Sequence, residues 1–113
     1  MSDLLGWAEH EFYLNQPDDK GITAREHLEQ VERQTGVKPE ALRNPHEFPR
    51  LLHHIWSAFL RLNSARTSGF SGPNPLTYSE MKAWQELTRT PLQARDFETI
   101  KRLDGVYMRV ANA

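Results

Sequence analysis

Apolar residues recur along most of this chain at steps of three and four residues, the spacing of one face of an α-helix. The strongest run covers about residues 49–66 and begins at Pro49. Proline suits the first turn of a helix, because the N–H it lacks would have no partner there. The apolar side chains of this run form a wide stripe, which predicts a central helix packed by more than one neighbour: Leu51, Leu52, Ile55, Trp56, Phe59, Leu60 and Leu62.

Two further helices are predicted from capping boxes, in which a Thr side chain and a Glu three residues later bond each other's backbone amides. Thr23 and Glu26 precede a helix that has a thin apolar stripe and ends at Gly36. Thr77 and Glu80 open a helix over about 78–89. Its apolar face holds Tyr78, Met81, Trp84 and Leu87. A last helix, about 94–111, presents Phe97, Ile100, Leu103, Tyr107 and Val110.

Turn residues separate these helices. Residues 15–21 form a polar break, Pro39 opens a single turn through Leu42, and residues 67–75 contain two Gly and two Pro, which predicts a loop without regular structure. Strand-forming runs are missing, since Val occurs at four positions and Ile at three. The chain is therefore expected to be one all-α domain over residues 1–113, a small bundle of four to five helices with the Gly/Pro-rich loop before the penultimate helix.

The N-terminal stretch allows two interpretations. Residues 1–15 are weakly amphipathic, with Trp7 and Phe12 among their apolar side chains. They form either a short helix docked on the body or, within residues 1–20, an arm kept for a partner.

Composition and charge narrow the class of protein. The chain has 113 residues and a formal net charge of −1, which argues against sequence-independent binding of nucleic acid. It has no cysteine, no apolar run long enough for a membrane span and no basic start typical of a secretory signal. We therefore expect no disulfide, no membrane association and a cytoplasmic location.

The charge is unevenly distributed along the chain. Residues 1–60 carry six Lys/Arg against ten Asp/Glu, a net −4, whereas residues 61–113 carry eight against five, a net +3. Such a dipole favours head-to-tail self-association or the docking of a basic face on an acidic partner, although small domains also show it by chance.

Candidate chemistry is sparse. His53 and His54 are neighbours on a helix and point about 100° apart, and the remaining histidines, His10, His27 and His46, show no metal-ligand spacing. The Gly-rich loop lacks the Lys and the preceding strand of a phosphate cradle. The two helices around it are too far apart for a helix-turn-helix. The sequence predicts no enzyme, no metal and no cofactor.

Asp104 is the polar residue that suggests a specific contact. Its spacing from Phe97, Ile100 and Tyr107 brings it near the apolar face of the last helix, where a carboxylate needs a partner. We expect Arg66 to hold it bidentately and so to fix the Gly/Pro loop in position. The alternative is a solvent-exposed Asp104.

From Ile55 onward the chain shows a distinctive combination of segments: residues 56–62, Arg66, the Gly/Pro loop with its following capping box (residues 69–80), Ala83-Trp84, Leu87, Pro91-Leu92 and residues 100–107. With these residues the chain resembles a family of small proteins encoded among the tail genes of long-tailed bacteriophages, the phage tail assembly chaperones. The resemblance covers roughly residues 52–108, and residues 1–48 show none.

The resemblance implies a non-catalytic chaperone that binds the helical tape-measure protein, keeps it soluble and recruits tail-tube protein in the host cytoplasm. Aromatic side chains are the candidates for such protein contacts, although each of them also suits a core: Phe70, Trp84, Tyr78, Trp56, Trp7 and Phe12. Phe70 is the best of them, because it lies in a loop, where packing is hardest to achieve. Two other roles stay open, an inhibitor of a host pilus or defence protein and a minor structural protein of the virion tail.

Overall fold

The structure is a computed structural model, and it describes residues 2–113. These residues form five α-helices: α1 (Ser2–Leu14), α2 (Ala24–Thr35), α3 (His53–Ser64), α4 (Tyr78–Thr88) and α5 (Ala94–Ala111). Two 3₁₀ turns, η1 (Glu40–Leu42) and η2 (Arg50–Leu52), lie between α2 and α3. The strands found in the described residues are two very short ones, β1 (Ser68–Gly69) and β2 (Gly72–Pro73). The expected all-α class is confirmed.

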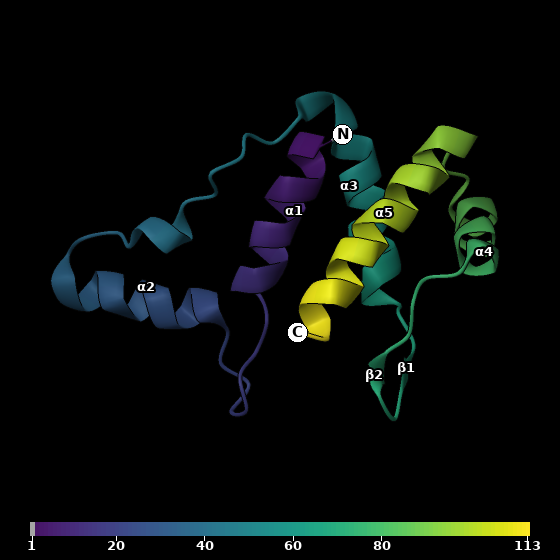
Figure 1. The fold of residues 1–113 in the computed structure, drawn as a ribbon. Coiled ribbons are helices and arrows are strands. Elements are labelled where there is room, and N and C mark those ends of the chain that lie inside the picture. Colours follow the sequence, from purple (N-terminus) through teal and green to yellow (C-terminus); the bar gives the residue numbers. More distant parts are fainter. Residues whose placement is uncertain (1) are drawn as a thin grey trace.

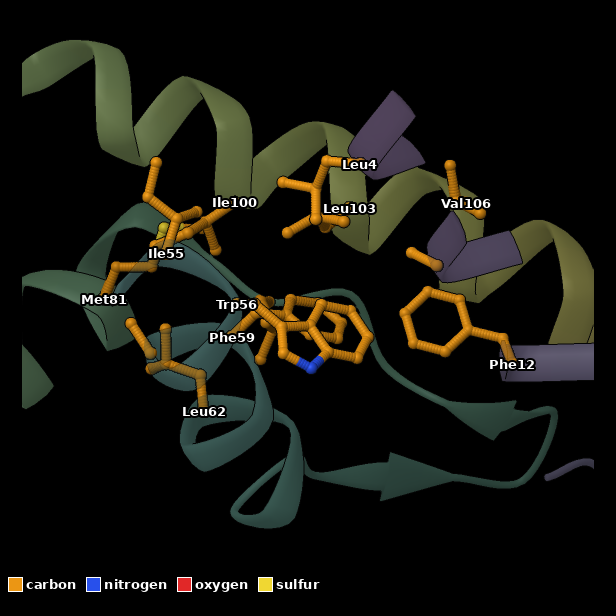
Figure 2. Packing of buried hydrophobic residues seen from close by; sticks show 13 residues of the cluster. Leu4, Phe12, Ile55, Trp56, Phe59, Leu62, Met81, Ile100, Leu103 and Val106 are labelled. Atoms are coloured by element: carbon orange, nitrogen blue, oxygen red, sulfur yellow. The ribbon is translucent and has the colours of Figure 1, made fainter. Parts of the chain in front are cut away.

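The core lies between α1, α3 and α5, and α5 packs against both of the other helices (Figure 1). Aromatic rings join the three helices: the Phe12 ring on α1 lies 5.7 Å from Trp56 and 5.6 Å from Phe59 on α3, and 5.4 Å from Tyr107 on α5. Figure 2 shows this cluster beside the aliphatic side chains of the core. Each such aromatic pair adds about 0.5–1.5 kcal/mol beyond the area that it buries, which matters in a chain with few aliphatic residues.

Of the two forms open to the N-terminal stretch, the structure has the docked helix. Leu4, Ala8 and Leu14 on α1 are completely buried. Burying a Leu side chain stabilises a fold by about 1.5–3 kcal/mol, so α1 is held by its own apolar face.

Helix α2 begins and ends where the sequence predicts. Thr23 Oγ1 accepts the Glu26 N–H at 3.1 Å, the Thr23 N–H donates to the Glu26 carboxylate at 3.4 Å, and Gly36 ends the helix with a φ of 76°. No residue of this helix is buried, and Figure 1 shows it projecting to one side of the body. The radius of gyration, 15.6 Å, accordingly exceeds the value of about 13 Å expected for a compact chain of this length.

The central helix is shorter than predicted. Pro49 precedes the 3₁₀ turn η2, and α3 runs only from His53 to Ser64. The prediction of a wide buried stripe is wrong at two positions, because the side chains of Leu51 and Leu60 are 90% and 45% exposed. Leu51 lies on the 3₁₀ turn, whose three residues per turn put it out of register with the α-helical face that follows.

The loop predicted for residues 67–75 is wrong in one respect, because it contains a regular element. Strands β1 and β2 pair antiparallel, with Ser68 opposite Pro73 and Gly69 opposite Gly72. Gly72 has a φ of 112°, a conformation that a residue with a side chain rarely adopts. The segment is therefore a minimal β-hairpin with residues 70 and 71 at its tip.

Helix α4 has the predicted bounds but a narrower buried face. Met81 is fully buried and Trp84 is partly buried, whereas Tyr78 is 53% and Leu87 85% exposed. Each three-residue step falls about 60° short of a full turn, so four residues at this spacing spread over half the helix. None of the helices in residues 2–113 is long and apolar enough to cross a membrane.

Candidate docking surface

The hairpin between α3 and α4 carries the most exposed aromatic side chain of the described residues. Phe70 lies at the tip and its exposed fraction is 113%, so the ring has no contact that shields it from water. The ladder that supports the tip is extended by backbone: the Asn74 N–H donates to the Thr67 carbonyl at 2.9 Å. The Asn74 side-chain amide adds a bond to Thr67 Oγ1 at 3.1 Å. The tip is thus exposed while its base is closed.

Arg66 and Asp104, which the sequence suggested as a pair, lie together beneath this base. Arg66 Nη2 is 2.7 Å from Asp104 Oδ1, and the two side chains are 5% and 3% exposed. Neither of these two atoms has a hydrogen-bond partner outside the ion pair. In place of the expected bidentate pair, only Nη2 of Arg66 contacts the carboxylate, since Nη1 and Nε donate to Asn74 and Asn63. The other carboxylate oxygen accepts the Leu76 N–H at 3.0 Å.

The same two side chains fix the backbone that returns from the hairpin. Arg66 Nη1 donates to the Asn74 carbonyl at 2.8 Å, so arginine and aspartate hold positions two residues apart. Lys101 on α5 donates to the Leu76 carbonyl at 2.8 Å. The backbone that returns from the hairpin is therefore attached to α5 by charged groups, next to the buried Leu76 side chain in the hydrophobic core.

Two more contacts fix the guanidinium plane of Arg66. Its Nε donates to Asn63 Oδ1 at 2.9 Å, and its central carbon lies 4.3 Å from the centre of the Tyr107 ring. A guanidinium stacked on an aromatic ring is stabilised by the electrons of the ring face, more so when water is excluded. A Lys at this position would have neither the plane nor the number of donors that these contacts use.

Three aromatic candidates belong to the core. Trp56 and Phe12 are 9% and 8% exposed, and Trp7 packs against the core with its ring 4.9 Å from Trp56. Figure 2 shows Trp56 and Phe12 within the packed cluster. Their rings face the neighbouring helices and are not presented to a partner in this conformation.

The two aromatic candidates on α4, Trp84 and Tyr78, are neither fully exposed like Phe70 nor part of the core like Trp56. Arg61 covers the Trp84 ring at 5.3 Å, and Lys101 lies 5.3 Å from the Tyr78 ring. The Tyr78 hydroxyl donates to Glu98 at 3.3 Å. Desolvation and the Glu98 carboxylate both raise the pKa of this hydroxyl. Both rings are thus already engaged by side chains of the same chain.

An apolar groove between α1 and α2 was not predicted from the sequence. It has a volume of about 670 Å³, and its walls include Tyr13 on α1, Pro17 and Ile22 in the connecting turn, Ala24 on α2 and Val110 on α5. Tyr13 is 57% exposed there. No local pattern marks these residues, because they meet only through the way α2 lies across the end of α1.

Histidines border this groove as structural groups. His10 Nε2 lies 2.9 Å from the Ala41 carbonyl, and His27 Nε2 lies 2.9 Å from Asp18 Oδ2. The His27 hydrogen bond, helped by the backbone amides of Ile22 and Lys20, lowers the pKa of Asp18 below its ordinary value. Within residues 2–113, no three His, Asp or Glu side chains are grouped so that they could hold a metal ion.

Comparison with known proteins places the chain in a family. A family model described as phage tail assembly chaperone matches residues 31–109, whereas neither the curated proteins nor the solved structures include a match. The match begins within α2, so the resemblance expected over residues 52–108 was drawn too narrowly, and part of the segment 1–48 is shared with the family. Because this match covers well over half of its 113 residues, the chain belongs to the phage tail assembly chaperone family.

Proposed function

We propose that this protein is a non-catalytic chaperone that binds the tape-measure and tail-tube proteins in the cytoplasm of the infected host, with Phe70 as its principal contact. Membership of the family gives the general role. The identity of the two partners comes from what the resemblance implies.

The observation that carries the proposal is the complete exposure of Phe70 on a hairpin whose base is fixed. Burying a Phe side chain at an interface stabilises it by about 1.5–3 kcal/mol, the range of an interaction hot spot. A side chain on a preordered turn loses little conformational freedom on binding, which raises the affinity of the contact. Phe70 thus has the exposure and the support that a docking residue needs.

The buried polar groups near the hairpin support a structural use rather than a chemical one. Arg66 and Asp104 direct their contacts to each other and to the backbone at Asn74 and Leu76. Both side chains are almost fully buried, so they hold the hairpin and present no charged group to a substrate.

Co-expression with the tape-measure protein tests the proposal. Wild-type chaperone is expected to keep the tape-measure protein soluble and to co-purify with it, whereas Phe70→Ala is expected to lose most of both effects. A loss of about 2 kcal/mol on binding corresponds to a roughly thirtyfold weaker complex. Leu87→Ala is the matched control, since Leu87 is 85% exposed but lies at the far end of α4.

Other outcomes decide between this role and the two alternatives. Capture of a host pilus or defence protein with no capture of tail proteins would favour the inhibitor. Mass spectrometry of purified particles separates a chaperone from a virion protein, because a chaperone is released before the tail is complete. Equal capture of the tape-measure protein by wild type and Phe70→Ala would contradict the assignment of Phe70.

A further inference from the structure

The groove between α1 and α2 is an apolar hollow that none of residues 2–113 fills. Tyr13, Pro17 and Ile22 line it, and Glu9 and Asp18 contribute carboxylates. Its volume, about 670 Å³, is ample for an aromatic side chain together with part of the backbone that carries it. Exposed apolar hollows of this kind on small proteins commonly mark contact sites.

The same chain carries an exposed aromatic side chain, Phe70, that suits an apolar groove; this side chain is called the knob below. Phe70 is fully exposed on a hairpin tip, and no residue of the hairpin lines the groove. Figure 1 places the β1–β2 hairpin and α2 on opposite sides of the C-terminal end of α5. A knob so placed does not reach the groove of its own chain, but it is free to enter that of another copy.

Charge favours this pairing of unlike surfaces. The groove is built chiefly from residues 1–60, which carry six Lys/Arg against ten Asp/Glu. The hairpin belongs to residues 61–113, which carry eight against five. The lining of the groove includes two carboxylates, Glu9 and Asp18, and no Lys or Arg, so a copy that approaches with its positively charged segment is attracted to it.

We propose that, before a tail protein is bound, the Phe70 hairpin of one copy docks in the α1–α2 groove of a second copy. The inference rests on the proposed function, since it assigns Phe70 a second partner. Knob and groove are different surfaces, so the contact is head-to-tail and each added copy leaves one free hairpin and one free groove. A tail protein that takes Phe70 then releases a copy from its neighbour.

The molar mass in solution, measured by sedimentation over about 10 µM to 1 mM, tests this contact, because one buried ring supports only weak association. Wild type is expected to rise above its monomer mass of 13.1 kDa as the concentration increases. Phe70→Ala and Tyr13→Lys are each expected to stay monomeric. Tyr13 lies in the last turn of α1, where a Lys is compatible with the helix dipole, so this substitution should block the groove without unfolding the chain.

Mixing the two monomeric variants gives the sharpest result. Phe70→Ala retains the groove and Tyr13→Lys retains the hairpin, so an equimolar mixture should form dimers and nothing larger. Tyr78→Lys is the matched control, because Tyr78 is exposed to nearly the same extent as Tyr13, 53% against 57%, and lies outside the groove. This control is expected to assemble like wild type, and circular dichroism should show every variant folded.

Three results would overturn the inference: a wild-type chain that stays monomeric at 1 mM, Tyr13→Lys assembling like wild type, or a mixture without dimers. Failure here is separable from failure of the proposed function. Tyr13→Lys should still capture the tape-measure protein, whereas Phe70→Ala should lose both capture and assembly. If the wild-type chain stays monomeric but its capture of the tape-measure protein still depends on Phe70, only the head-to-tail contact between copies is contradicted.

Discussion

Arg66 and Asp104 show how a carboxylate is tolerated on the inner face of α5. Their side chains are 5% and 3% exposed, and every contact found for them is to another group of the same chain. Desolvation of both charges offsets much of their attraction, so the pair adds little net stability of its own. Its use is to specify where the hairpin lies.

Breaking the pair on one side is expected to cost far more than the pair contributes. Asp104→Leu leaves a buried guanidinium without its counter-charge, so the free energy of unfolding should fall by about 3–5 kcal/mol in urea denaturation. The double variant Arg66→Met with Asp104→Leu should lose clearly less than Asp104→Leu alone. A loss below about 1 kcal/mol for Asp104→Leu would mean that the arginine is not buried as described.

Asp18 provides a pH-dependent contact at the same scale. Hydrogen bonds from His27 and from the backbone amides of Ile22 and Lys20 lower its pKa, so its carboxyl should titrate by NMR with a midpoint below the ordinary 3.8. A lowered pKa stabilises the fold above the unfolded-state pKa, and this contribution is lost as the pH falls through the folded-state pKa. His27→Ala should raise the midpoint, and an unchanged midpoint would contradict the hydrogen bond.

At the scale of helices, features that depend on neighbours in the sequence were predicted well, whereas features that depend on packing between elements were not. Thr23 forms the full capping box as expected, since a cap needs only neighbours three residues away. Thr77 caps α4 through the Glu80 N–H, but the expected reciprocal bond from the Thr77 N–H to the Glu80 carboxylate is not found. The exposure of Leu51 and Leu60 was not predictable, because the spacing of apolar residues does not say which edge of a stripe a neighbour covers. The pairing of residues 67–75 was also missed, since the two strands have only two residues each.

The two caps should differ in their effect on the whole fold. Thr77→Ala removes the cap of α4, which buries Met81, and should lower global stability by about 1 kcal/mol. Thr23→Ala should instead speed amide hydrogen exchange within residues 24–35, with little change in the unfolding midpoint, because α2 buries no residue. An equal drop in the midpoint for both variants would show that α2 unfolds together with the body.

For the molecule as a whole, the key residues of the hairpin could be predicted from the sequence, whereas the groove could not. Phe70, Arg66 and Asp104 stand out because a loop aromatic and a carboxylate on an apolar face are anomalies within their own segments. The groove assembles Tyr13, Ile22 and Val110 from three separate segments, and no spacing along the chain brings these together. Charge segregation is visible in the sequence, but its role depends on where the two halves present their surfaces.

Photo-crosslinking in infected cells tests most directly whether Phe70 is the point of contact with tail proteins. A photoreactive phenylalanine analogue at position 70 is expected to crosslink the chain to the tape-measure or tail-tube protein, identified by mass spectrometry. The same analogue at position 87, an exposed site on α4, is expected to give little of either product. Tail-protein crosslinks that are equally strong from both positions, or absent from position 70, would contradict the account.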